Sequence, residues 1–240
     1  MEFLTIKTRK FLPPKDNLFE LLDNYLPKLK EKDILVITSK IISIGQGRTV
    51  KITPQTDRIA LIKKEADAYL PNCPSSMTAK DHTLTPFAGI DRSNANGYYV
   101  LWPKSPHLEA KKIWSYLIKK FSLKQLGIII TDSFCLPFRW GHLGISIGFF
   151  GFNPLYSYQG QKDIFNRKLI RHNSNLVDAL AALAVIHMGE GNEQTPLCLI
   201  RCFNNLEFNQ KDYSKSFYIS PADDLYTPLL ANLKSACKKN

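Results

Sequence analysis

The chain contains 240 residues, of which 44% are hydrophobic and 22% charged, and it carries a formal net charge of +11 at neutral pH. This composition is that of an ordinary globular protein with an ample core, and it excludes a disordered or low-complexity chain. No uninterrupted apolar stretch approaches the length of a membrane-spanning helix, and Met1–Lys7 lacks the apolar core of a signal peptide, so we expect no membrane partner and a cytoplasmic location.

The positive charge is scattered along the chain. Short lysine pairs such as Lys63-Lys64, Lys111-Lys112 and Lys119-Lys120 lie in segments with a helical pattern, which is typical of solvated helix faces. A positive field suits an enzyme with polyanionic substrates, whereas a basic RNA-binding protein would need a coherent positive face with exposed aromatic residues. We favour the enzyme and expect no nucleic-acid partner, with RNA binding as a remote alternative.

Hydrophobic periodicity predicts a mixture of strands and helices along the chain. In chain order, the predicted elements are a strand at Met1–Lys7, a helix capped by Asp16 and reaching Tyr25, a strand at Asp33–Ile37, a helix at Ile59–Leu70, a loop and short strand within residues 71–87, a strand at Tyr98–Leu101, a helix at Leu108–Phe121, a strand at Leu126–Thr131, a glycine-rich strand within Gly141–Gly151, a helix at Leu176–Met188 and a strand at Pro196–Phe203. The mixture predicts an α+β fold with two intertwined lobes of mixed sheets and flanking helices.

These elements lie within residues 1–208, which form the predicted main domain, and residues 209–240 form a polar C-terminal appendage. The helix at Leu176–Met188 is almost continuously apolar, so we expect it to be buried. The five cysteines include no C-x-x-C pair and lack further ligands at zinc spacing, so we interpret them as small buried hydrophobic residues.

Three turns rich in oxygen ligands follow apolar elements. The run Ile128-Ile129-Ile130 leads into Thr131-Asp132-Ser133, the turn Gly89–Asn94 carries Asp91, and Met188–Glu193 carries Glu190. Carboxylates and hydroxyls are hard oxygen ligands, so the three turns predict a site for a divalent metal and phosphate. Asp132-Ser133 is also compatible with a plain turn, Asp91 and Asn94 with an Asx-turn, and the glycines after Met188 with a helix C-terminus.

Basic and hydroxyl side chains supply further candidates. Thr38-Ser39-Lys40 places hydroxyls and an ammonium at a strand end, which suits phosphate oxygens, while Arg48, Arg139 and Arg167 are candidate clamps for a carboxylate. The chain has no G-x-x-x-x-G-K-[ST] motif, so a nucleotide would be held by another scheme. The histidines show no metal spacing, and His142 is the one nearest the predicted site.

Four of these segments together resemble the coenzyme F-420:L-glutamate ligase family. They are D-I-L-V-I-T-S-K-I-I-S-I-G-Q-G-R at residues 33–48, A-G-I-D-R-S-N at residues 88–94, and residues 128–148 and 178–196, in the family's order and spacing. The resemblance implies a γ-glutamyl ligase that uses GTP and divalent cations to couple L-glutamate to the acidic tail of a deazaflavin coenzyme. It also implies an intertwined homodimer.

The resemblance assigns roles residue by residue. It places metal ligands at Asp91, Asp132, Ser133 and Glu190. It places nucleotide contacts at Ser39, Lys40, Asn94, the N-terminal loop Phe11, Leu12, Pro13 and Pro14, and the segment Met188, Gly189, Glu190, Gly191, Asn192, Glu193, Gln194 and Thr195.

The chain departs from the family at several positions. Ser133 stands where Thr is usual, which keeps the oxygen ligand; Cys135 stands where Gly is typical, Gln159 where Arg is common, and Asn166 where Gly is typical. Residues 96–104 and 189–196 look like a bacterial branch thought to serve folate metabolism, so we favour a folate-type acceptor, with coenzyme F-420-0 and GTP as the alternative.

The predicted reaction forms an amide through an acyl phosphate. The acceptor carboxylate attacks the γ-phosphate of GTP or ATP, and the amine of L-glutamate then displaces phosphate. We expect Mg²⁺ or Mn²⁺, with K⁺ as a further candidate, and catalytic roles for Lys40, Arg139 and Arg167. A catalytically dead relative would bind nucleotide without consuming it, and it remains the other alternative.

Overall fold

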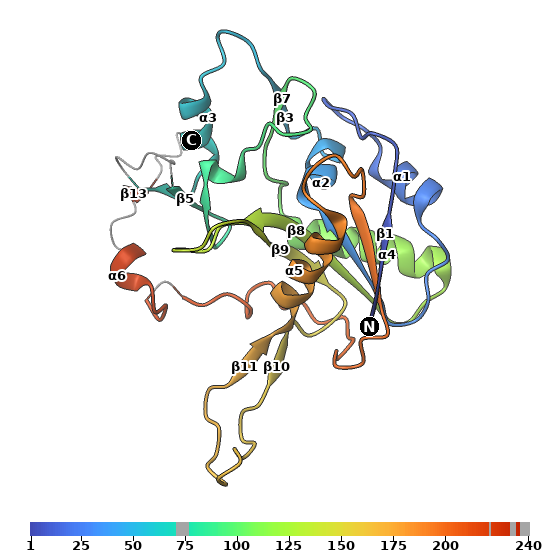
Figure 1. The fold of residues 1–240 in the computed structure, drawn as a ribbon, viewed down its shortest axis with the longest axis vertical. Helices are drawn as coiled ribbons and strands as arrows, with labels where there is room; N and C mark the ends of the chain where they lie inside the picture. Colours follow the sequence, from blue (N-terminus) through green and yellow to red (C-terminus); the bar gives the residue numbers. More distant parts are fainter. Residues whose placement is uncertain (71–76, 221, 231–233, 236–240) are drawn as a thin grey trace.

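A computed structural model describes residues 1–70, 77–220, 222–230 and 234–235 (Figure 1). Its largest sheet has five strands, in the order β1 (Glu2–Ile6), β12 (Leu197–Arg201), β2 (Asp33–Thr38), β8 (Leu126–Phe134) and β9 (Leu143–Phe150). The central pair β2 and β8 is parallel, and the other neighbours are antiparallel. Both faces of the central strands are covered, which explains why their sequences read as continuous apolar runs.

Helices cover the two faces of this sheet. On one face α4 (Pro106–Phe121) packs together with α1 (Leu18–Tyr25) and α2 (Ser39–Gly45), and the buried residues there include Leu35, Ile113 and Ile128. On the other face α5 (Leu176–Met188) packs on Val36 and Ile129. Adjacent residues of a strand therefore enter different cores, as the period-two geometry of a strand requires.

A smaller unit lies beside the main sheet. It contains α3 (Arg58–Glu65) and a sheet in the order β13 (Lys234–Ser235), β4 (Ala68–Tyr69), β5 (Met77–Lys80) and β6 (Thr83–Pro86), followed by the 3₁₀ turn η1 (Phe87–Gly89). The ribbon β3 (Thr49–Lys51) with β7 (Tyr98–Val100) adjoins it, and Ile62, Ala88 and Tyr99 form its small core. Glu65 ties the unit together because it pairs with both Arg48 and Lys80.

A hairpin arm projects from the body of the molecule (Figure 1). Its base is the pair β10 (Leu155–Ser157) and β11 (Asn173–Asn175), which leads directly into α5. The chain after β12 returns across the main sheet, where Tyr213 and Phe217 pack against the α5 core, and it continues to α6 (Thr227–Leu230). The division of the chain at residue 208 stays a prediction.

The structure confirms a mixed α+β architecture and corrects several local predictions. The predicted helix at Ile59–Leu70 ends at Glu65, because Ala68 and Tyr69 pair with β5. The first helix is capped by Asn17, whose side chain accepts from the Glu20 amide, whereas Asp16 binds Arg9. Among the described residues, no helix is long and apolar enough to span a membrane.

Two expectations about burial were wrong. The helix α5 is buried only on one face, since Ile186 is 74% exposed. Of the described cysteines, Cys198 is buried as expected, but Cys135 and Cys202 are exposed. Cys73 and Cys237 lie outside the described residues.

Candidate functional site

A cavity of about 1260 Å³ lies where the parallel strands β2 and β8 end at the same edge of the main sheet. This edge is where ligands of open α/β sheets commonly bind. All three oxygen-rich turns predicted from the sequence meet there. The sequence-predicted residues that line the cavity are Phe11, Leu12, Pro13, Lys40, Asp91, Asn94, Asp132, Ser133 and the whole segment Met188–Thr195.

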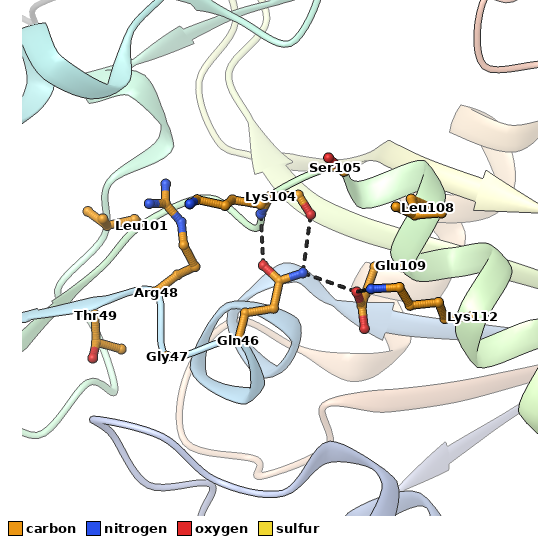
Figure 2. Close-up of a pocket in the computed structure, with 10 residues that line it drawn as sticks. All are labelled: Gln46, Gly47, Arg48, Thr49, Leu101, Lys104, Ser105, Leu108, Glu109 and Lys112. Carbon is orange, nitrogen blue, oxygen red and sulfur yellow. Dashed lines mark hydrogen bonds and ion pairs between the residues drawn. The ribbon is translucent and has the colours of Figure 1, made fainter. Parts of the chain in front are cut away.

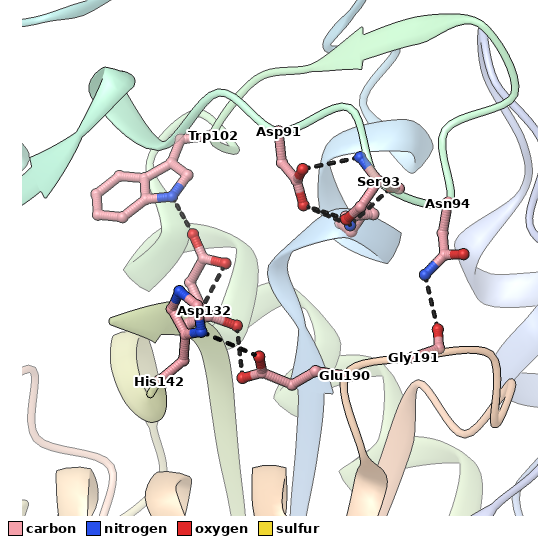
Figure 3. Close-up of polar contacts among 10 residues, drawn as sticks. Asp91, Ser93, Asn94, Trp102, Asp132, His142, Glu190 and Gly191 are labelled. Atoms are coloured by element: carbon pink, nitrogen blue, oxygen red, sulfur yellow. Dashed lines mark hydrogen bonds and ion pairs between the residues drawn. The ribbon is translucent and has the colours of Figure 1, made fainter. Parts of the chain in front are cut away.

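Asp132 lies within β8, opposite Ile145, and not beyond its end as the sequence suggested. A register shift between Ile130 and Thr131 accompanies the continuation of the strand. The Trp102 indole N–H donates to Asp132 Oδ2, and Figure 3 shows the two side chains in contact. Burial raises the pKa of Asp132 to about 6, and the hydrogen bonds from Trp102, the Ser133 amide and Ser39 only partly oppose this effect.

Gly89 makes room for that indole. Its backbone has φ +69°, and a Cβ at this position would overlap the Trp102 ring. The Gly89–Asn94 turn therefore depends on glycine for both its conformation and its close approach to Trp102. The contact of Gly89 with Trp102 and the hydrogen bond from Trp102 to Asp132 join residues far apart in the chain, so the sequence did not predict either of them.

Asp91 is held by a dense set of hydrogen bonds. Lys40 Nζ lies 2.7 Å from Asp91 Oδ2 and also donates to Ser93 O and Oγ at 2.9 Å. The Ser93 amide and hydroxyl donate to the two Asp91 oxygens at 2.8 and 2.6 Å. Burial alone would raise the pKa of Asp91, but Lys40 and Ser93 together hold it below its ordinary value, so the carboxylate stays ionised.

The Met188–Thr195 loop after α5 is the third of the oxygen-rich turns that line the cavity. Ser133 Oγ donates to Glu190 Oε1 at 2.9 Å, and His142 Nδ1 lies 3.9 Å from Glu190 Oε2. Asn94 Nδ2 donates to the Gly191 carbonyl at 2.8 Å, so two predicted nucleotide-contacting segments touch each other (Figure 3).

The donor set fits a divalent cation in kind. Asp91, Asp132, Ser133 and Glu190 offer hard oxygen atoms to one cavity, as Mg²⁺ and Mn²⁺ prefer. Within the described residues, however, no group of three or more His, Cys, Asp or Glu side chains converges tightly enough to hold a metal by itself. A cation would thus share these oxygens with a bound ligand or with water, as is usual for Mg²⁺ at phosphates.

Several predicted residues lie away from the cavity wall. Ser39 is buried and bonds to Asp132, and Pro14 accepts from Thr49 through its carbonyl. Arg139 and Arg167 are exposed, on the β8–β9 loop and on the projecting arm. Neither is among the residues that line the cavity.

Arg48 belongs to a different pocket, of about 570 Å³ (Figure 2). Its guanidinium is paired with Glu65 and bonds the Trp102 carbonyl, which makes it a structural residue. Gln46 also lines this pocket and forms hydrogen bonds with the Lys104 backbone and the Glu109 carboxylate.

Comparison with known proteins adds an independent finding. A family model described as "F420-0:Gamma-glutamyl ligase" matches residues 6–202. A protein of Methanocaldococcus jannaschii named coenzyme F420:L-glutamate ligase is 33% identical over 78% of this chain and 82% of its own length. Proteins of the same name from Archaeoglobus fulgidus and Haloarcula marismortui are 27% and 28% identical, over 85% and 94% of this chain and 88% and 95% of their own.

Proposed function

The chain belongs to the F420-0:gamma-glutamyl ligase family, and we propose that it couples L-glutamate to the carboxylate tail of coenzyme F420 in a nucleotide- and metal-dependent reaction. The names of the relatives support this acceptor over the folate-type acceptor that the sequence favoured. The observation that carries the proposal is the meeting of Lys40, Asp91 and Asp132 in one cavity, although they are far apart in the chain.

The proposed chemistry has two steps. The acceptor carboxylate attacks the γ-phosphate of GTP or ATP, which forms an acyl phosphate and releases the diphosphate nucleotide. The amine of L-glutamate then attacks the acyl carbon, and phosphate leaves as the amide bond forms. Both steps move negative charge among phosphate oxygens, so the site must supply positive charge and exclude water.

Among the cationic side chains that line the cavity, Lys40 is the one that we assign to the phosphates. Its ammonium is already oriented by Asp91 and Ser93, so little side-chain entropy remains to be lost when a phosphate binds. A divalent cation held by Asp91, Asp132, Ser133 and Glu190 would add charge neutralisation there. The Met188–Thr195 loop is the proposed cover for the nucleotide, because it lines the cavity and touches Asn94.

The test is a mass-spectrometric ligation assay with coenzyme F420 precursor or a reduced folate as acceptor, L-glutamate, Mg²⁺ or Mn²⁺, and GTP or ATP. We expect a mass gain of one glutamyl residue on the F420-type acceptor. A mass gain on the folate alone would favour the folate-type acceptor. Nucleotide binding without a mass gain on either acceptor would favour a catalytically dead relative.

Asp132→Asn is the matching variant. It keeps the shape of the side chain but removes its charge, so we expect kcat to fall on the order of 100-fold or more. Asp23→Asn is the control, because Asp23 pairs with Lys120 on the surface and does not line the cavity. Near-normal turnover of Asp132→Asn would show that catalysis does not need this carboxylate.

A further inference from the structure

Arg58 is a cavity-lining arginine that the sequence did not single out. It is the first residue of α3, and its guanidinium carbon lies 4.3 Å from the centroid of the Phe87 ring and 5.8 Å from that of Tyr99. Such stacking is favourable and fixes the plane of the guanidinium. Arg58 lines the cavity, as do Phe87, Thr85 and Pro86.

The guanidinium of Arg58 has neither a hydrogen bond nor an ion pair within the described part of the chain. Its Nε is buried without a hydrogen bond, and no carboxylate there forms an ion pair with it. By contrast, Arg9, Arg48 and Arg201 each bind an aspartate or glutamate. Buried polar groups in proteins are almost always satisfied, so an unpaired, half-buried guanidinium at a cavity wall calls for an anion from outside the chain.

The backbone that presents Phe87 to Arg58 is strained. Phe87 and Ala88 adopt positive φ values of 57° and 53°, and Gly89 follows with 69°. The turn is held by the Ala88 amide, which donates to Thr78 Oγ1 at 2.8 Å, and by the Ile90 amide, which donates to the Phe87 carbonyl at 3.0 Å. Left-handed residues other than glycine cost free energy and concentrate at ligand sites.

The same turn sets the position of Arg58 relative to the acidic end of the cavity. Asp91 lies four residues after Phe87, and its backbone pairs with Val100 next to Tyr99, the second ring near Arg58. Arg58 therefore lines the same cavity as Asp91 and Lys40, and the Met188–Thr195 loop lines it as well.

We propose that Arg58 binds a carboxylate of an organic substrate and thereby determines specificity; this rests on the proposed ligase function. The planar guanidinium offers paired donors that match a carboxylate in a bidentate geometry. In the proposed reaction, carboxylates come from two sources, L-glutamate and the acceptor. The nucleotide phosphates are assigned to Lys40 and the loop after α5.

The experiment compares the steady-state kinetics of the wild type with those of Arg58→Ala and Arg58→Lys, varying L-glutamate, acceptor and nucleotide in turn. Loss of a charged hydrogen-bonded pair predicts a rise of about 10–100-fold in KM for L-glutamate or for the acceptor, with kcat changed far less. Arg58→Lys keeps the charge but loses the paired N–H donors of the guanidinium, so we expect its KM to lie between those of the wild type and Arg58→Ala. Lys64→Ala, an exposed charge removal on the same helix, is expected to match the wild type.

Glutamate analogues identify which carboxylate is bound. If Arg58 holds a carboxylate of glutamate, the wild type discriminates against L-glutamine or L-isoglutamine, each of which has one carboxylate replaced by an amide. Arg58→Ala then loses the discrimination against one of the two. If KM rises for the acceptor instead, the carboxylate is the acceptor's. A rise confined to the nucleotide, or no rise for any substrate, overturns the proposal.

Substrate binding to Arg58 can also be measured without turnover. Isothermal titration calorimetry of L-glutamate and of the acceptor measures binding to the wild type and to Arg58→Ala. A wild type that binds these substrates without ligating them would contradict the proposed function alone. Equal dissociation constants in the two proteins would contradict the role of Arg58 alone.

Discussion

Asp132 owes its position to a neighbour that has no charge. Trp102, only 3% exposed, donates its indole N–H to Asp132, and Gly89 provides the space for the ring. Trp102→Phe removes the donor and keeps most of the packing. We expect kcat to fall about 10-fold because the carboxylate can rotate away, and the free energy of unfolding to fall by about 1.5–3 kcal/mol, as for a lost hydrogen bond to a charged group.

Trp140→Phe is the matched control for this substitution. Trp140 lies fully exposed in the loop between β8 and β9, so the same chemical change there should alter neither kcat nor the melting temperature. Full activity of Trp102→Phe, measured in the ligation assay, would show that Asp132 is held adequately by Ser39 and the strand itself.

The acidic residues of the site were predictable from sequence, whereas their supports were not. Asp91, Asp132 and Glu190 stand out because each follows an apolar element and carries hard oxygens. The contact of Trp102 with Asp132 and that of Arg58 with Phe87 join residues distant in the chain, and no local pattern marks such contacts. Arg139 and Arg167 were predicted from their residue type and their place in Gly- and aromatic-rich loops, and neither property determines where an exposed loop or arm points.

Periodicity predicted the five strands of the main sheet and the helices α1, α4 and α5, but it did not predict α2, the β10–β11 pair or the register shift in the β8–β9 pair. Ile145, Ile147 and Phe149 look like one face of a strand, yet Ile147 and Phe149 pack in different cores because the register shifts between Ile130 and Thr131. As a result Gly144 faces α5 and Gly148 faces Pro106 of α4. An irregularity of one residue is invisible to a period-two pattern, and it decides which helix meets which glycine.

Gly144 sets how closely α5 approaches the sheet. A Cβ at this position would lie 2.7 Å from the Ala181 carbonyl oxygen and even closer to Val185. Gly144→Ala should therefore push α5 outward, lower the free energy of unfolding by about 1–3 kcal/mol, and raise KM for the nucleotide, because α5 leads directly into Met188–Thr195. Urea unfolding and steady-state kinetics measure the two effects.

Gly45→Ala is the control for this substitution. Outside its own helix, the nearest atom to a Cβ there is the Leu18 Cβ at 3.3 Å, and the nearest backbone atom is the Asp16 carbonyl oxygen at 3.9 Å. We expect a change below about 1 kcal/mol. If Gly144→Ala were equally mild, α5 would be free to adjust without moving the loop that it carries.

The molecule as a whole presents an ordered arm with an apolar surface. Hydrogen bonds continue beyond the β10–β11 pair toward the tip, from the Gly160 amide to the Leu169 carbonyl at 2.9 Å and from the Asp163 amide to the Arg167 carbonyl at 2.9 Å. Yet Ile164, Phe165 and Ile170 are 90%, 77% and 73% exposed. A preorganised element that exposes large apolar side chains is typical of a surface that binds another protein.

The family resemblance predicts a homodimer, so we propose that this partner is a second copy of the chain. Light scattering should give twice the mass of one chain for the wild type. Replacement of Ile164, Phe165 and Ile170 by Ser should raise the dissociation constant of the dimer at least about 100-fold, because each buried apolar side chain contributes about 1.5–3 kcal/mol. Leu225→Ser is the control, because Leu225 is 93% exposed but lies outside the arm. A wild type that remains monomeric at every accessible concentration would show that the arm does not bind a second copy of the chain. An arm variant that dimerises as tightly as the wild type would show that the dimer contact lies elsewhere on the surface.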